Sequence, residues 1–423
     1  MTDMARTPRP HKGGLYATSA WKQDFGPEGP VKHGVGDKVR TWWAGLSRPA
    51  QWGVGVPAII LLALLPLFPP PLIDTPGTSF SGVMAQFAMT ALIAVGLNVV
   101  VGQAGLLDLG YVGFYAVGAY TVGLLTSPNS PWNQTDGWLK PGWAWVICVP
   151  LAIAVTAVSG LILGTPTLRL RGDYLAIVTL GFGEIVRLLA ENLGDITNGS
   201  LGLSRIAYPH IGGTEANPGG HFSSGNLGDK NSGNLLDRAN SGAWWFWMGM
   251  AFVIVILLIV GNLERSRVGR AFVAIREDED VAEMMGVPTF KFKLWAFMIG
   301  AGIGGMSGAL YAGQVQFINP TGFNIINSML FLCAVVIGGQ GNKLGVIVGA
   351  FLIVYLPNRF MSVNVGGQSL GEYKYLFYGV ALVVVMIFRP QGLFPVRQKL
   401  LAYGRTVYRA VHRTPGETTG GVR

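Results

Sequence analysis

The sequence is poor in charge and in cysteine. Charged residues make up 13% of its 423 residues, about half the share found in a soluble domain. The two cysteines, Cys148 and Cys333, lie in apolar runs, which argues against a disulfide framework or a zinc site. The apolar runs are continuous rather than alternating, so a β-barrel is not expected. The composition predicts an all-α, polytopic transmembrane helical bundle.

The common signatures of catalysis are also missing. No Gly-Lys pair occurs, so the chain has no Walker A loop, and it has neither a Gly-x-Ser-x-Gly nor a His-Glu-x-x-His motif. The five histidines fall in predicted tails and outward loops. We therefore expect no enzyme activity, no catalytic residue, no cofactor and no metal site. The net charge of +9 is concentrated in loops and tails, which is typical of membrane topology and does not indicate a nucleic-acid partner.

Long apolar runs are what the sequence has in abundance. A membrane span needs about 20 apolar residues, and we predict about eight to ten spans, because the eighth and ninth runs are short and could form one broken hairpin. The ten candidates are 53–72, 83–101, 106–125, 143–163, 174–190, 244–260, 294–311, 329–339, 344–356 and 375–388.

The basic residues predict how these spans are oriented. With the N-terminus inside, the loops that carry most arginines and lysines all fall on the cytoplasmic side, as the positive-inside rule requires. We expect a basic, mostly disordered cytoplasmic tail at 1–52, a permease domain at 53–389 and a basic cytoplasmic tail at 390–423. A polar loop at 191–242 would lie outside, as a lid, a docking surface or a plain linker.

One stretch, 262–293, stands out by its charge, and we call it the charged segment. It reads NLERSRVGRAFVAIREDEDVAEMMGVPTFKFK and lies between two apolar runs. Its acidic run is followed by Val281, Ala282, Met284 and Met285, which predict a short helix with an apolar face. Gly286 should end that helix, and Pro288 prevents its continuation. Such a helix would lie on the cytoplasmic surface and dock onto a partner; an ordinary solvated loop is the alternative.

Two other patterns within the spans have both a functional and a structural interpretation. Glu184 and Arg187 lie on one helical face, and they either line a substrate path or form a structural ion pair. Gly300, Gly304 and Gly308 recur at four-residue spacing, which favours close helix packing over ligand binding.

Three segments resemble one known family, the LivM-type permeases of branched-chain amino acid ABC importers. They are GLNVVVGQAGLLDLGYVGFYAVGAYTVGLL at 96–125, LRLRGDYLAIVTLGFGEIVRLL at 168–189, and EDEDVAEMMGVPTFKFKLWAFMIGAGIGGMSGALYAG at 277–313. The segment VVIGGQGNKLGVIVGA at 335–350 is a looser match.

The resemblance implies an ABC importer permease fold in the plasma (inner) membrane of a bacterium, with both termini in the cytoplasm. It also implies four kinds of partner: a second, homologous permease, two ATP-binding subunits, an extracytoplasmic binding protein and the lipid bilayer.

The resemblance also suggests candidate site residues. In such importers a cytoplasmic loop docks into the ATPase, which makes Ala282, Glu283, Met285 and Gly286 the candidate coupling residues. Asn98, Gln103 and Tyr111, with Glu184 and Arg187, are candidates for the translocation path.

The sequence is also compatible with other transport functions. They are a permease for urea or short amides, a proton-coupled secondary transporter that uses Glu184 and Arg187, and a channel.

Overall fold

The computed structural model describes residues 62–70, 75, 78–133, 141–170, 172–212, 219–228, 238–360, 364–365, 368–369, 373–388 and 392–393. The chain divides into two compact units, 1–63 and 64–423, and every helix and strand named below belongs to the second. The predicted tail at 1–52, most of the first predicted span and almost all of the tail at 390–423 lie outside the described residues.

Each of the nine predicted spans after the first coincides with a helix. They are α4 (Phe80–Leu97), which continues as the π-helix η1 (Asn98–Gln103), α5 (Tyr111–Thr126), α6 (Pro141–Thr167), α7 (Asp173–Asn192), α10 (Ser241–Arg265), α13 (Thr289–Val315), α14 (Ile325–Gly338), α15 (Lys343–Phe360) and α16 (Lys374–Phe388). Four of the described helices (α4 with η1, α6, α10 and α13) are long and apolar enough to cross a membrane, and α5 and α14 are shorter apolar helices. The prediction of an all-α polytopic bundle is confirmed.

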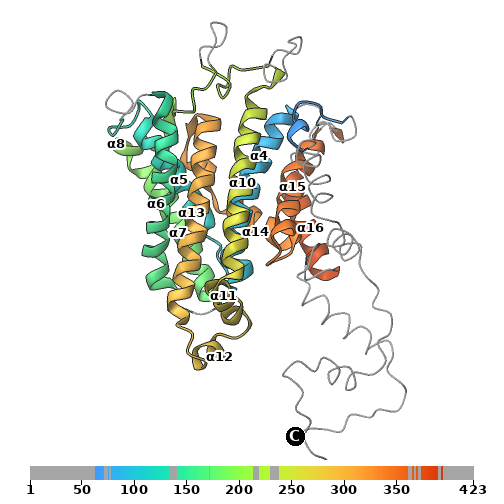
Figure 1. Ribbon diagram of the computed structural model, residues 1–423. Helices are drawn as coiled ribbons and strands as arrows, with labels where there is room; N and C mark the ends of the chain where they lie inside the picture. Colours follow the sequence, from blue (N-terminus) through green and yellow to red (C-terminus); the bar gives the residue numbers. More distant parts are fainter. Residues whose placement is uncertain are drawn as a thin grey trace, which may run out of the picture. The chain divides into compact units, whose positions relative to one another are not determined.

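Short elements connect these helices. They are α8 (Gly194–Thr197), η2 (Gly199–Leu201), β1 (Leu203–Ser204), α11 (Arg267–Glu277), α12 (Glu279–Met284), β2 (Phe317–Ile318), η3 (Pro320–Phe323), β3 (Asn364–Val365) and β4 (Gln368–Ser369). β1 pairs antiparallel with β2, with Leu203 opposite Ile318. The start of the predicted 191–242 loop is therefore folded and fastened to the segment that follows α13. α11 and α12 lie at the opposite end of the bundle, which we call the α12 end (Figure 1).

The start of α5 differs from the prediction. Its helix begins at Tyr111, not at Leu106, because Gly105 adopts a left-handed conformation with φ of +72° and the next residues form a turn. The side chain of Asp108 accepts a hydrogen bond from the amide of Gly110 at 2.9 Å within that turn, and Gly110 is the N-cap of α5.

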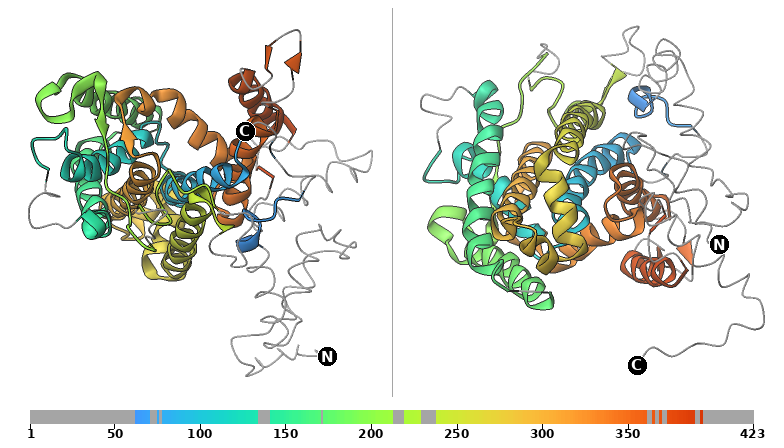
Figure 2. Two further views of the ribbon diagram at one scale, coloured as in Figure 1. Left: turned by 90° about the horizontal axis from the view of Figure 1, so that it is seen from above. Right: turned by 60° about the horizontal axis from the view of Figure 1, so that its bottom comes forward.

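Two helices form the interior of the bundle. In an apolar 18-residue stretch of each helix, 94% of the residues are buried in α4 with η1 and 72% in α13, against only 33% in α6 and 39% in α10. α13 packs against α4, α5 and α6, and α4 packs also against α10 and α15 (Figures 1 and 2). The outer faces of α6 and α10 expose large apolar side chains such as Ile162 and Leu258. An apolar surface of this kind suits contact with lipid.

Glycines allow the inner helices to approach closely. A Cβ atom on Gly308 of α13 would collide with the carbonyl oxygen of Tyr115 on α5, and a Cβ on Gly118 of α5 would collide with the carbonyl oxygen of Gly305. A Cβ on Gly300 would collide with the Val100 side chain, and a Cβ on Gly304 would lie 3.2 Å from the Tyr111 ring. The packing interpretation of the Gly300–Gly304–Gly308 pattern is therefore confirmed.

α14 and α15 form a tight hairpin. A Cβ on Gly338 would collide with the carbonyl oxygen of Gly345, and a Cβ on Gly349 with that of Ala334. The two short apolar runs that the sequence left ambiguous are thus two helices joined by the turn 339–342.

We predict that Gly308→Leu destabilises the bundle, because the obstacle is the backbone of α5 and cannot move aside as a side chain would. The thermal midpoint of the purified protein in detergent should fall by about 5 °C or more. Gly181→Leu on α7 is the matched control, since nothing lies within 4 Å of its would-be Cβ. Equal midpoints for the two variants would contradict the packing described here.

Candidate functional site

The charged segment folds into two short helices, α11 and α12, between the long helices α10 and α13. Ser266 separates α10 from α11, and its hydroxyl oxygen caps α11 by accepting a hydrogen bond from the amide of Gly269 at 3.3 Å. A side chain at Gly269 would collide with the carbonyl oxygen of Leu263, so the turn between the two helices is tight. The chain thereby changes direction after α10, at the α12 end of the bundle (Figure 1).

Capping groups define α12 at both of its ends. The Asp278 carboxylate accepts a hydrogen bond from the amide of Val281 at 3.0 Å. At the other end Gly286 takes a φ of +83°, the Gly286 amide donates to the Glu283 carbonyl at 2.9 Å, and the Val287 amide donates to the Ala282 carbonyl at 3.0 Å. These two bonds form a Schellman motif. The predicted short helix, ended by Gly286, is confirmed.

The exposed face of α12 is apolar but narrower than predicted. Val281 is 48% exposed, Met284 78% and Met285 79%, whereas Ala282 is 5% exposed. Residues three and four apart share a helical face, and an adjacent residue is turned away by about 100°. Ala282 therefore packs α12 onto the rest of the chain and is not part of the exposed apolar face. Glu283 and Gly286 are exposed beside that face.

A buried ion pair joins α12 to α13. The Lys293 ammonium lies 2.5 Å from the Glu279 carboxylate, with side-chain exposures of 5% and 28%. Removing a lysine ammonium from water is costly unless a carboxylate lies within contact distance. Glu279 supplies that carboxylate from the first turn of α12, so the short helix has a fixed place against the first turns of α13.

Other residues of the charged segment contact η1. Arg276 donates a hydrogen bond from Nη1 to the Gly102 carbonyl at 2.5 Å. Glu264, in the last turn of α10, accepts from Gln103 Nε2 at 2.8 Å and pairs with the Lys343 ammonium at 2.6 Å. The ends of α10, η1 and α15 thus meet in one polar cluster.

Of the candidate path residues, Asn98 and Gln103 belong to this region. Asn98 is fully buried and its Oδ1 accepts from the Gly341 amide at 2.8 Å. Within the described part of the chain, Asn98 Nδ2 and Gln103 Oε1 are buried without a hydrogen-bond partner. A π-helix with incompletely satisfied polar groups is a frequent feature of functional sites.

Tyr111, a third candidate, is a packing residue in this structure. Its side chain is fully buried, and its hydroxyl donates to the Gly300 carbonyl at 2.6 Å. It thereby ties the start of α5 to α13. The structure does not bring it together with Asn98 and Gln103 in the polar cluster at the α12 end.

Glu184 and Arg187, the remaining candidates, belong to a larger network than predicted. Arg187 pairs with Glu184 at 2.5 Å and with Glu191 at 2.7 Å, and all three side chains are 21–39% exposed. Spacings of three and four residues place the three charges on one face of α7. The network lies in the half of α7 that leads to α8, away from the α12 end (Figure 1). The same spacing rule would have identified Glu191 from the sequence.

The sequence reasoning missed Glu264, Glu279 and the partners of their carboxylates. In the sequence, Lys293 and Lys343 were considered only as positive charges of predicted cytoplasmic loops. One signal in the sequence could have identified Glu264, which lies in the last turn of an apolar helix. A negative charge there is unfavourable with the helix dipole and needs a positively charged partner.

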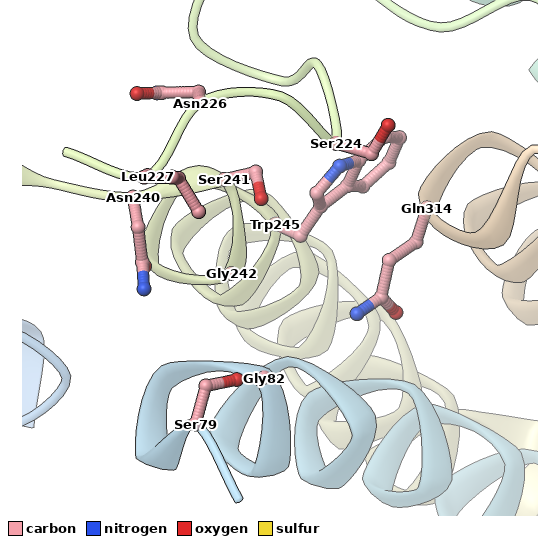
Figure 3. A pocket seen from close by; sticks show the side chains of 10 residues that line it. All are labelled: Ser79, Gly82, Ser224, Asn226, Leu227, Asn240, Ser241, Gly242, Trp245 and Gln314. Carbon is pink, nitrogen blue, oxygen red and sulfur yellow. The ribbon is translucent and has the colours of Figure 1, made fainter.

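A pocket of about 310 Å³ lies at the opposite end of the bundle, between the starts of α4 and α10 and the end of α13 (Figure 3). Some of its polar side chains form internal hydrogen bonds. Asn240 caps α10 through the Ala243 amide at 3.1 Å and donates to Ser81 at 2.6 Å, and Trp245 Nε1 donates to the Phe222 carbonyl at 3.1 Å. No group of three or more potential metal ligands occurs among the described residues.

Comparison with known proteins agrees with this architecture. Residues 79–386 match the family described as the permease component of branched-chain amino acid transport systems. The high-affinity branched-chain amino acid permease protein LivM of Escherichia coli K12 is 39% identical over 314 residues, which cover 73% of this chain and 68% of that protein. The probable LivM of Methanocaldococcus jannaschii is 23% identical, over 74% of this chain and 93% of that protein.

A differently named permease matches as well. LivH of Escherichia coli K12, also a permease of a high-affinity branched-chain amino acid transport system, is 23% identical over 72% of this chain and 90% of its own length. No solved structure matches the chain.

We predict an unequal effect for the two partners of the buried ion pair. Glu279→Gln leaves the Lys293 charge buried without its partner and should lower stability by about 3 kcal/mol. Lys293→Met leaves the more exposed Glu279 facing water and should cost much less, and the double variant should recover most of the loss. Thermal unfolding in detergent measures all three, with Lys291→Met, an exposed lysine of the same helix, as control. Equal losses in the two single variants would contradict this assignment.

Proposed function

The chain belongs to the family of permease components of branched-chain amino acid transport systems, multi-pass membrane proteins that work with other components of an ABC importer, and on this premise we propose a function for it. The proposed function is that of a membrane-spanning permease subunit that translocates branched-chain amino acids with energy supplied by separate ATP-binding subunits. The α12 end faces the cytoplasm, as do both termini, and the membrane is the plasma membrane of a bacterium.

One observation carries this proposal: α12 presents an apolar face to solvent, while some charged side chains of the charged segment fasten the segment to the helices. Val281, Met284 and Met285 are exposed on α12, where none of the described helices covers them. An exposed apolar cluster of this kind favours contact with another protein. Glu283 and Gly286 lie beside the cluster, so the docking site comprises the second half of α12 and the Schellman turn.

The partners follow from the same premise. The chain is similar to both LivM and LivH of one organism, which supports a pair of similar permeases as the membrane unit. Two ATP-binding subunits dock at the cytoplasmic end, one on each permease. A binding protein delivers the substrate at the opposite end, where β1, β2 and the folded part of the 191–242 loop lie.

The attachment of α12 to α13 explains how docking of a partner can move a membrane helix. A docked helix transmits force only if it moves together with a membrane helix. α12 meets this condition because the Glu279–Lys293 pair and buried Ala282 hold it against α13. When the ATP-binding subunits close, α12 and α13 move together and the bundle changes between outward and inward access. The energy comes from ATP, and coupling depends on the difference in docking contacts between the two states.

The translocation path is assigned to side chains of η1 and α7 that carry unsatisfied or charged polar groups. Asn98 and Gln103 line its cytoplasmic part, and Glu184 with Arg187 lies nearer its outer part. Charges within a membrane helix face protein or water and not lipid, which gives the exposed face of α7 an aqueous or protein environment.

We predict that the apolar face of α12 determines ATPase docking. Met285→Glu introduces a charge at the centre of the contact and should reduce co-purification of the ATP-binding subunits by about tenfold. Met285→Leu, which preserves the apolar volume, should leave co-purification unchanged. If both variants retain the ATP-binding subunits equally, α12 is not the docking site.

The turn at Gly286 and the charge at Glu283 should be needed for coupling. Gly286→Val is strained at a φ of +83°, and Glu283→Lys reverses a charge at the contact. Both should abolish ATP-driven uptake while the permease still inserts in the membrane at normal levels. Gly194→Val, at a glycine whose would-be Cβ meets nothing within 4 Å, serves as control. Normal uptake in the Gly286 and Glu283 variants would argue against this role.

Glu184→Ala tests whether Glu184 lines the translocation path or only stabilises the structure. Arg187 keeps Glu191 as a partner, so we expect the permease to assemble normally while branched-chain amino acid uptake falls by about tenfold. Size-exclusion chromatography measures assembly and radiolabelled leucine measures uptake. A parallel loss of assembly and uptake would instead identify the network as structural.

A further inference from the structure

The described part of the chain contains two kinds of ion pair at the α12 end. In the Glu279–Lys293 pair the lysine side chain is buried, at 5% exposed, and the glutamate side chain is 28% exposed. The Glu264–Lys343 pair is partly open to water, with side-chain exposures of 33% and 25%. A buried pair is costly to separate, whereas a partly solvated pair opens easily because water replaces the lost contact. The first suits a permanent joint, and the second suits a contact that breaks and re-forms.

Glu264 uses both of its carboxylate oxygens to join separate helices. Oε1 accepts a hydrogen bond from Gln103 Nε2 at 2.8 Å, and Oε2 lies 2.6 Å from the Lys343 ammonium. Gln103 is the last residue of η1 and Lys343 the first of α15. Because Glu264 itself is in the last turn of α10, a single carboxylate connects three membrane helices at the same end of the bundle.

A second contact joins the charged segment to the same part of η1. Arg276 Nη1 donates to the carbonyl of Gly102 at 2.5 Å, one residue before Gln103. The Arg276 side chain also lies against Gly105, where Cγ would be 2.8 Å from an added Cβ. Arg276 lies two residues before Asp278, the cap of α12. A displacement of α12 is therefore transmitted through Arg276 directly to the residues beside Gln103.

The surroundings of Gln103 are suited to rearrangement. η1 is a π-helix, and Gln103 Oε1 and Asn98 Nδ2 are buried without a hydrogen-bond partner in the described part of the chain. Asn98 Oδ1 meanwhile binds the amide of Gly341 in the turn before α15. A helix end with unsatisfied buried groups gives up little when its contacts change.

We propose that Glu264 is a positioning residue for transport: it forms, with Gln103 and Lys343, a latch that closes the cytoplasmic ends of α10, η1 and α15 together, and movement of the charged segment opens and closes it. The proposal rests on the proposed function, because it assigns the means by which the docked helix controls the inner end of the path. Opening separates Glu264 from Gln103 and Lys343 and exposes all three to water. No covalent step is involved.

The test uses the whole transporter, reconstituted in lipid vesicles with its second permease, its ATP-binding subunits and its binding protein. The measured quantity is the amount of ATP hydrolysed per leucine taken up. Glu264→Met and Lys343→Met each remove the latch and should raise this ratio about five-fold or more. The double exchange Glu264→Lys with Lys343→Glu restores an attractive pair. Oε1 of Gln103 can then accept a hydrogen bond from the ammonium introduced at position 264, so the ratio should return close to its original value.

Arg267→Gln is the matched control, because Arg267 is an exposed charge of the same segment, and its ratio should not change. A residue that is only structural would lower the amount of assembled transporter and leave the ratio unchanged, which would overturn the latch. A double exchange as poorly coupled as the single variants would also overturn it. If the unaltered transporter shows no ATP-dependent uptake, the proposed function itself fails, which is a different result from an unchanged ratio in an active transporter.

Discussion

A charge inside a membrane bundle has to be paired, and this constraint shapes the whole α12 end of the protein. Lys293 is buried at the start of α13 and is paired with Glu279. That requirement holds α12 against the bundle, and Arg276 and Glu264 then hold the rest of the charged segment against η1. Four charged side chains of the segment therefore fasten it, while its other charges and the apolar side chains of Val281, Met284 and Met285 are exposed.

Close helix packing allows these contacts to transmit movement between helices. Glycines bring α13 against α4 and α5, and bring α14 against α15, with backbone atoms as the contact surfaces. Helices packed on their backbones have little freedom to slide individually, because an interior at this density transmits displacement. A force applied at α12 therefore reaches α13, the helix around which α4, α5 and α6 are packed.

Much of the fold was predictable from the sequence, because a membrane span and a glycine repeat leave local signals. The long helices coincide with the apolar runs of the sequence. Gly286 and Pro288 indicated where α12 ends. The sequence was less informative where a turn interrupts an apolar run. The predicted start of α5 was five residues too early, because Gly105 adopts a left-handed conformation before the helix begins. Ala282 was assigned to the exposed face because α12 is too short for an apolar pattern to separate its two sides.

The candidate site was less predictable, because its contacts join residues distant in sequence. The Gln103–Glu264 bond spans 161 residues, and no spacing rule relates its partners. The charged segment and α13 are expected to move as one body. Spin labels at the exposed residues Val273 and Trp295 in the assembled transporter test it most directly, by the distance between them without nucleotide and with ATP trapped. We predict one narrow distribution that is the same in both states. A distribution that shifts or broadens on ATP binding would contradict the claim.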